Sequence, residues 1–265
     1  MARNSLVAYS KRAARRASFW LRPRPSFLII GGIRCGTTSL IRYLGEHPDV
    51  APSATKEVHY YDWYFDRGES WYRSWFPIGP QSTGAGESSP AYLMDPNAPA
   101  RVAASLPDVR LLLLLRNPIE RAHSHYRYRK GKGQEKAATF EDALDDEPRR
   151  LQAATTAHRP QAAGALDCYY HHGNYAVGLE RWIQHLGRDQ LLIMESDQFY
   201  ADPAGTYGRV LDFLGLPPYE LSHHPVHNAA ADAPINPETR AALAERYAAP
   251  NQALYDIAGT DWGWH

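Results

Sequence analysis

The chain of 265 residues contains little cysteine and carries no net charge. Its two cysteines, Cys35 and Cys168, exclude a framework of several disulfide bonds. No histidine stands at the spacing from a cysteine that defines a zinc site, so we predict that the protein holds no metal. The 29 basic and 29 acidic side chains balance, which gives no general attraction to nucleic acid or to anionic glycans, so we predict no nucleic-acid partner and expect any attraction to an anionic cofactor to be local.

The N-terminal segment lacks acidic residues and long apolar stretches. Residues 1–24 carry seven Lys and Arg side chains and no Asp or Glu. No apolar run within them is long enough for a signal peptide or a membrane anchor. We therefore expect a basic N-terminal tail at residues 1–24, with attachment to an anionic membrane surface or to a partner protein as the alternative, and one domain at residues 25–265.

A glycine-rich turn is the most informative feature that is present. Residues 27–39 are typical of a buried strand that runs through this turn into a helix, where backbone N–H groups can bind a phosphate. The turn is similar to a Walker A loop, but Thr37 replaces the lysine of that loop and the cation is Arg34. This change favours a single 5′-phosphate with a charged group attached, because the lysine serves a triphosphate. The predicted phosphate-binding residues are Arg34, Cys35, Gly36, Thr37, Thr38 and Ser39.

A second phosphate-type motif follows the apolar run at residues 109–115, which is typical of a buried strand. Arg116 ends the run, and Pro118 is suited to begin a helix. Ser124 lies about two helical turns after Arg116, so it can return to the end of the strand. Alone, the pattern also fits a helix-capping arginine and a surface serine. Its position at the carboxyl end of a second strand favours nucleotide binding.

Together these motifs resemble those of the sulfotransferases that depend on 3′-phosphoadenosine 5′-phosphosulfate (PAPS). In that family a lysine usually stands at the position of Arg34, and the arginine and serine of the 3′-phosphate site map onto Arg116 and Ser124. Residues 57–62, Glu-Val-His-Tyr-Tyr-Asp, are similar to a segment of the heparan-sulfate-type and bacterial carbohydrate O-sulfotransferases. The resemblance implies an α/β fold of three layers, P-loop-like, with a mainly parallel central sheet flanked by helices.

The resemblance also implies an activity, the transfer of a sulfuryl group from PAPS to an acceptor hydroxyl, with PAP as the product. The acceptor would be a sugar, a glycolipid or a secondary metabolite. The proposed base of the heparan-type enzymes maps onto Glu57, Arg34 would offset charge on the leaving phosphate, and His59 is the competing base. Weaker contacts to the acceptor are expected from Lys56, Tyr60, Trp63 and Ser88, where Ser88 replaces a lysine of the family. Since no segment resembles the Golgi anchor of the eukaryotic relatives, we expect a cytoplasmic, bacterial enzyme.

Two other interpretations stay open. A kinase or other P-loop NTPase would need a Walker lysine and an acidic magnesium ligand after a strand, but Thr37 and Arg116 occupy those positions. A nucleotide-binding protein without catalysis would need Glu57 to lie away from the cleft. The chain also departs from the family near residues 227–232, which contain no arginine. In the family, a loop with an arginine often closes over the nucleotide at this point. Either His227 or Asn228 replaces part of the contact between that loop and the nucleotide, or the segment is only a connection.

Overall fold

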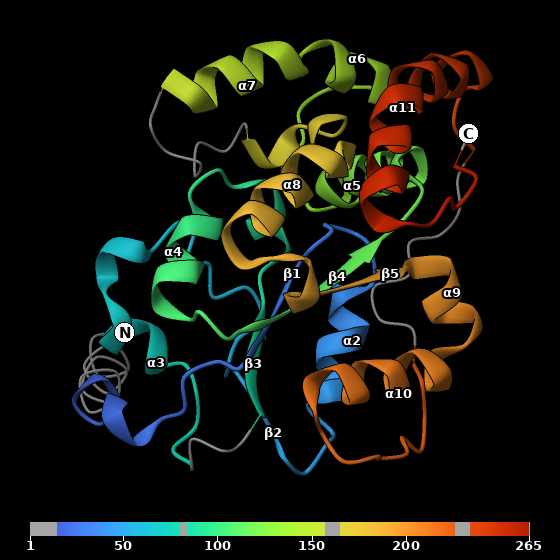
Figure 1. The fold of residues 1–265 in the computed structure, drawn as a ribbon. Helices are drawn as coiled ribbons and strands as arrows, with labels where there is room; N and C mark the ends of the chain where they lie inside the picture. The colour runs from blue at the N-terminus through green and yellow to red at the C-terminus, as the bar shows by residue number, and fades with distance from the viewer. Residues whose placement is uncertain (1–14, 80–83, 157–164, 226–233, 265) are drawn as a thin grey trace.

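A parallel sheet of five strands forms the centre of the computed structural model, which describes residues 15–79, 84–156, 165–225 and 234–264 (Figure 1). The strand order is β2-β3-β1-β4-β5, and every pairing of neighbours is parallel. The strands are β1 (Phe27–Gly31), β2 (Val50–Pro52), β3 (Gly84–Ser88), β4 (Arg110–Leu115) and β5 (Leu191–Glu195). The predicted α/β class and parallel sheet are confirmed.

Helices cover both faces of the sheet, which explains why the central strands β1 and β4 are apolar along almost their whole length. Leu28 and Leu111 face one helix layer, whereas Ile29 and Leu112 face the other. The first layer consists of α4 (Ala98–Ser105), α8 (Tyr175–Leu186) and α11 (Pro237–Ala258). The second layer consists of α2 (Thr37–Leu44), α9 (Ser196–Ala201) and α10 (Pro203–Leu214). The sheet between them completes the expected three layers.

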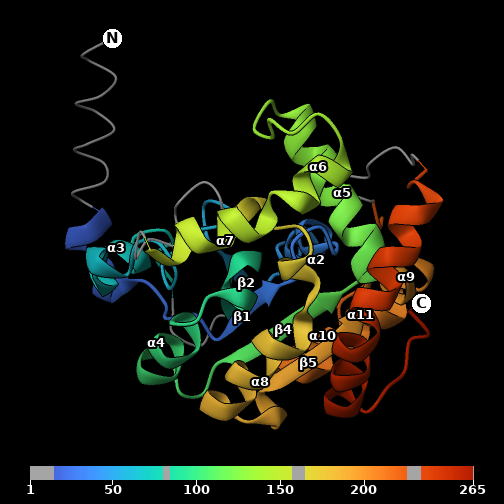
Figure 2. The same ribbon diagram turned by 90° about the horizontal axis from the view of Figure 1, so that it is seen from above.

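A third group of helices packs around its own apolar cluster and lies to one side of the sheet in Figures 1 and 2. The residues of the cluster come mainly from α5 (Pro118–Gly131), α6 (Phe140–Asp145) and α11, and α7 (Glu147–Thr156) contacts α6. Asn117 begins α5, because its side chain accepts a hydrogen bond from the N–H of Ile119 at 3.0 Å. The remaining helices are short: α3 (Glu69–Arg73), η1 (Phe19–Leu21), η2 (Phe65–Arg67), η3 (Pro90–Met94), η4 (Ala165–Asp167), η5 (His171–Gly173) and η6 (Arg188–Gln190).

The described part of the N-terminal segment is attached to α3. Arg22 is buried and donates a hydrogen bond to the carbonyl of Phe76, and Arg73 donates to the carbonyl of Arg22 at 3.1 Å. Arg24 forms an exposed ion pair with Glu69 at 2.9 Å. A division of the chain at residue 24 stays a prediction. None of the helices in the described ranges combines the length and apolar character that crossing a membrane requires.

Candidate active site

The loop between β1 and α2 has the backbone that the sequence predicted for a phosphate site. Gly36 adopts a φ of +94°, and a Cβ at this position would lie 2.8 Å from the hydroxyl of Tyr200. Only glycine combines that φ with so close a neighbour. No side chain caps the N-terminus of α2, which begins at Thr37. The N-terminus is therefore available to bind an anion.

Arg34 and Ser124 bring the two predicted phosphate motifs together. The Nε of Arg34 donates to the Oγ of Ser124 at 3.4 Å, and the guanidinium lies 4.5 Å from the ring centre of Tyr128. Burial lowers the pKa of Arg34, Tyr128 opposes this, and the nearby Arg116 lowers the pKa further. An arginine nevertheless stays charged near neutral pH. The two cations therefore raise the positive potential at one end of the sheet.

The side chains of the other loop residues are mostly buried. Burial raises the pKa of the Cys35 thiol, whose sulfur lies 3.8 Å from the hydroxyl of Tyr175, so this cysteine is a buried thiol rather than a thiolate nucleophile. Thr37 and Ser39 are also buried, whereas Thr38 is half-buried. The backbone N–H of Cys35 donates to the carbonyl of Gly32 at 3.2 Å, and that of Ser39 donates to the carbonyl of Gly36 at 2.9 Å, so both are engaged within the loop. The predicted binding roles of these residues stay predictions.

Glu57, His59 and Asp62 form a line of side chains at the neighbouring strand end. The backbone N–H of Glu57 donates to the carbonyl of Ser88 at 2.9 Å, at the end of β3, which lies beside β1. The Nε2 of His59 lies 3.6 Å from Oε2 of Glu57, and its Nδ1 lies 2.8 Å from Oδ2 of the buried Asp62. The imidazole therefore connects an accessible carboxylate to a buried one.

The charges in this line stabilise one another. Burial favours the neutral form of His59, but hydrogen bonds to Asp62 and Glu57 outweigh it and raise the pKa of His59 to about 9. Partial loss of solvent contact likewise opposes the ionised form of Glu57, yet contacts with His59 and Lys56 lower the pKa of Glu57 to about 2. At neutral pH the line thus contains an imidazolium between two carboxylates.

Unusual backbone conformations coincide with the three residues that the sequence predicts to be catalytic. Among the described residues, the non-glycine positions with positive φ are Arg34 at 67°, Glu57 at 61° and His59 at 54°. Each such conformation costs on the order of 1 to 3 kcal/mol and persists only where the surroundings enforce it. Strain of this kind is typical of a functional site.

The four residues expected to contact the acceptor occupy different environments. Lys56 pairs with Glu57, and the half-buried Trp63 stacks on the His59 ring at 3.7 Å. Tyr60 is buried and stacks on Tyr72, and Ser88 is fully buried. As placed, neither of these two side chains is open to an acceptor. Their roles stay predictions.

Asp62 is the site residue that sequence reasoning missed. It stands three residues after His59, and a carboxylate at that spacing from a histidine is the signal that could have identified it. His227 and Asn228, the expected replacements for the basic loop, lie outside the described residues. No group of three potential metal ligands gathers within the described part of the chain, and the predicted absence of a metal stays a prediction.

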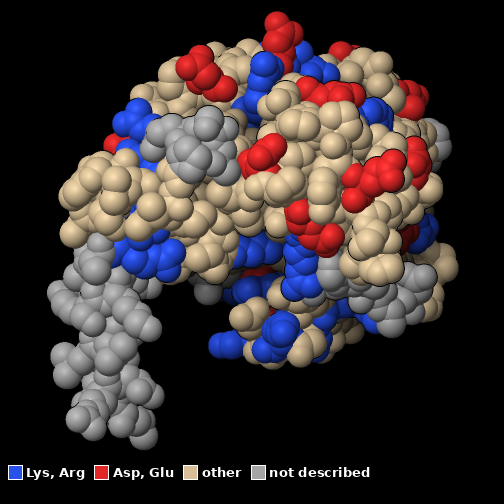
Figure 3. Space-filling view, turned by 90° about the horizontal axis from the view of Figure 1, so that it is seen from below, with Lys and Arg blue, Asp and Glu red and all other residues tan. Residues whose placement is uncertain are grey.

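Basic side chains follow the phosphate motif along α5. The helix passes from Ser124 into a segment with several exposed cations, and on the face drawn in Figure 3 Lys and Arg gather around a hollow in the surface. The basic residues of this segment are Arg127, Arg129, Lys130, Lys132 and Lys136. Arg129 is neutralised by its ion pair with Asp167, and the other four add to the local positive charge although the whole chain is neutral.

Comparison with known proteins finds similarity to sulfotransferases. The sequence model of the sulfotransferase domain matches residues 24–233. Human heparan sulfate glucosamine 3-O-sulfotransferase 3B1 is 30% identical over 267 residues, which cover 91% of this chain and 65% of the relative. Human heparan sulfate glucosamine 3-O-sulfotransferase 6 is also 30% identical, covering 91% and 73%. This chain thus spans just under two thirds of the length of the first of these relatives.

A solved structure extends the similarity to three dimensions. The crystal structure of a sulfotransferase from Alicyclobacillus acidocaldarius superposes with a TM-score of 0.75 at 27% sequence identity. The superposition covers 90% of this chain and 97% of that one.

Proposed function

Because the chain belongs to the sulfotransferase domain family, as its sequence predicted, we propose that it transfers a sulfuryl group from PAPS to a sugar hydroxyl, with Glu57 as the general base. The observation that carries this proposal is the contact of Glu57 with His59, whose second nitrogen contacts Asp62. A protonated imidazole cannot accept a proton. The raised pKa of His59 therefore favours Glu57 over His59 as the base.

The residues at the end of β1 fit a nucleotide with a 5′-phosphate and a separate 3′-phosphate. The uncapped N-terminus of α2 and Arg34 would bind the 5′ side, and Arg116 with Ser124 would bind the 3′-phosphate. Within the described residues, no carboxylate lies within ion-pair distance of Arg116, so its charge is not neutralised by an acidic side chain. This electrostatic setting supports binding of a doubly phosphorylated nucleotide.

In the proposed step, the acceptor oxygen forms a bond to sulfur as the bond between sulfur and the phosphate oxygen breaks. The electron pair of the broken bond leaves with PAP, and the acceptor proton passes to the Glu57 carboxylate. Arg34 offsets the negative charge that grows on the leaving phosphate. With a pKa of about 2, Glu57 is ionised at neutral pH. As the O–S bond forms, the acceptor hydroxyl becomes acidic enough to give its proton to the Glu57 carboxylate.

A sugar acceptor is supported by the names of the relatives, which act on glucosamine in heparan sulfate. The basic segment after Ser124 is suited to an acceptor that itself carries acidic groups. Trp63, which stacks on His59 and is half-buried, is an aromatic side chain of the kind that packs against sugar rings.

The test is incubation of the protein with sulfur-labelled PAPS and a panel of acidic glycans, neutral glycans, glycolipids and phenols. We expect label in the glycans, and Glu57→Gln should reduce turnover by about 10²- to 10⁴-fold while PAP binding stays nearly unchanged. His59→Ala should reduce it less. Near wild-type turnover in Glu57→Gln would move the role of base to another group, and labelling of phenols alone would overturn the sugar acceptor.

A further inference from the structure

We propose that Glu87, which is buried beneath the turn at residues 57–63, is a positioning residue that holds the proposed base in its working conformation. This inference rests on the proposed function, because it concerns the turn that carries Glu57. Glu87 is the penultimate residue of β3 and is 0% exposed. No hydrogen bond or ion pair of the described residues joins it to Glu57, and it acts through two hydroxyl groups.

Three hydroxyl groups converge on the Glu87 carboxylate from inside the protein. The Oγ of Ser89 donates to Oε2 at 2.7 Å, and the hydroxyl of Tyr92 donates to Oε1 at 2.7 Å. The hydroxyl of Tyr72 donates to Oε1 at 3.3 Å. All three partners are buried, so water does not substitute for these bonds.

Two of these hydroxyls also accept backbone N–H groups from the turn. Ser89 accepts from the N–H of His59 at 3.1 Å. Tyr92 accepts from the N–H groups of Tyr60 at 2.8 Å and Tyr61 at 3.2 Å. Glu87 therefore anchors three consecutive amides, although it is bonded to none of them.

The direction of the hydrogen bonds requires an acceptor at position 87. A backbone N–H can only donate, so the oxygen atoms of Ser89 and Tyr92 are used as acceptors and their protons must be accepted elsewhere. An ionised carboxylate accepts on both oxygens. Burial raises the pKa of Glu87, and the hydrogen bonds from Ser89 and Tyr92 oppose that rise, so the same contacts that fix the turn favour the ionised form.

The turn needs such an anchor because its conformation is strained. Glu57 and His59 both have positive φ, and a turn released from its anchors would relax toward ordinary backbone angles. A shift of about 1 Å in the base is enough to reduce turnover by about 10²-fold.

A glutamine at position 87 tests this requirement for an acceptor on both oxygens with little change in side-chain shape. Its oxygen can accept from one hydroxyl, but its NH₂ group must donate to the other, whose own proton then has no acceptor. Ser89→Ala and Tyr92→Phe each remove one of the two connections. Tyr72→Phe is the matched control, because Tyr72 donates to Glu87 but accepts no backbone N–H of the turn.

The experiment measures kcat, KM for PAPS, PAP affinity by calorimetry and thermal midpoint for these four variants and for Glu57→Gln. We expect Glu87→Gln, Ser89→Ala and Tyr92→Phe to lower kcat by about 10- to 100-fold with PAP affinity nearly unchanged, and Tyr72→Phe to retain kcat within about twofold. Hydrogen exchange of a peptide that covers residues 57–63 should accelerate in the first three variants and not in the control. Should Glu87→Gln fail to fold, Ser89→Ala carries the test.

A kcat in Ser89→Ala and Tyr92→Phe equal to that of Tyr72→Phe would overturn the positioning role. The same holds if all four variants lose kcat in proportion to their thermal midpoints, because that pattern reports stability alone. Glu57→Gln separates the two proposals. If it is inactive while Ser89→Ala is fully active, only the positioning role fails, whereas full activity of Glu57→Gln removes the base and with it the positioning role.

Discussion

Arg34 and Ser124 lie 90 residues apart in the chain, and the guanidinium of the first donates to the hydroxyl of the second at 3.4 Å. The contact joins the loop after β1 to the helix after β4, strands that are neighbours in the sheet. Two motifs that are separate in the sequence thus lie in contact in the structure. The contact also gives Arg34 a defined direction, because α5 holds both Ser124 and the Tyr128 ring against it.

Arg34→Ala should lower kcat more than it weakens PAP binding, because the charge of Arg34 becomes more important as the leaving phosphate gains charge. Removing one such stabilising group typically costs about 10²- to 10³-fold in kcat. Arg34→Lys should retain considerable activity, since it keeps the cation. Steady-state kinetics with calorimetry of PAP provides the comparison. Equal losses in kcat and affinity would make Arg34 an anchor for the bound nucleotide instead.

Arg116→Ala should remove most of the preference for PAP over 5′-AMP. One charge-assisted hydrogen bond contributes about 1.5 to 3 kcal/mol, so a single contact to the 3′-phosphate should favour PAP by about 10- to 100-fold. Affinity for 5′-AMP, which lacks that phosphate, should change little. Calorimetry of wild type and variant with PAP, AMP and ATP decides the point. Equal affinity of the wild type for PAP and AMP would be incompatible with the proposed nucleotide.

The raised pKa of His59 predicts a change of stability with pH. The ordinary histidine pKa is 6.5 and that of His59 is about 9, so protonated His59 contributes stability that is full below about pH 6.5 and lost as the pH rises through about 9. Asp62→Asn removes the buried charge and should move this loss to lower pH by about 1 to 2 units. The alkaline limb of the kcat profile should move in the same direction. Thermal midpoints and kcat measured from pH 5 to 10 report the two effects. If neither pH profile changes in Asp62→Asn, Asp62 does not raise the pKa of His59.

The sequence predicted the parts of the fold that burial determines. The apolar runs at residues 27–31 and 109–115 correspond to β1 and β4. A strand that is covered by helices on both faces is apolar along its length and does not alternate between apolar and polar residues. The sequence did not predict β3, whose residues Gly84–Ser88 show no apolar pattern. This strand is formed by close packing: a Cβ at Gly86 would lie 2.3 Å from the Phe27 ring.

The site was predictable where the chemistry lies in the residue types, and not where it lies in backbone geometry. Arg34, Glu57 and His59 were proposed as site residues from motifs, and that assignment stays a prediction, but their positive φ angles cannot be read from composition. Asp62 acquires its role only because the turn brings it to His59. Glu87 is hidden for the same reason, since its contact with the turn passes through Tyr92, which η3 carries back beneath the site.

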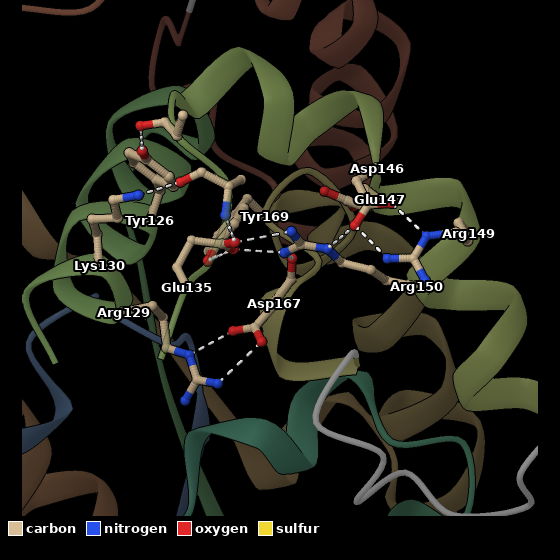
Figure 4. A network of polar contacts seen from close by, with 12 residues as sticks. Tyr126, Arg129, Lys130, Glu135, Asp146, Glu147, Arg149, Arg150, Asp167 and Tyr169 are labelled. Carbon is tan, nitrogen blue, oxygen red and sulfur yellow. Dashed lines mark hydrogen bonds and ion pairs between the residues drawn. The ribbon is translucent and has the colours of Figure 1, made fainter. Parts of the chain in front are cut away.

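A network of ion pairs at the far end of α5 provides a test of stability away from the site (Figure 4). Arg150 on α7 makes a bidentate pair with the buried Glu135, at 2.6 and 3.0 Å, and also donates to Asp146 at 2.9 Å. Burial would raise the pKa of Glu135, but the hydrogen bonds from Arg150 and Tyr169 lower it to about 2. The neighbouring Arg149 contacts Asp146 as well, but from an exposed position.

Arg150→Met should therefore destabilise the protein by about 3 to 5 kcal/mol, because it leaves the Glu135 carboxylate buried without its cation. Arg149→Met is the matched control: its side chain is 74% exposed against 10% for Arg150, so solvent already screens its pair with Asp146 and its loss should be hard to measure. Urea unfolding of the two variants beside the wild type measures the difference. Glu135 stabilises the fold only while it is ionised. The difference in free energy of unfolding between the two variants should therefore decrease as the pH falls through about 2. Equal stabilities of Arg149→Met and Arg150→Met at neutral pH would mean that the Glu135 pair contributes no more than a surface contact.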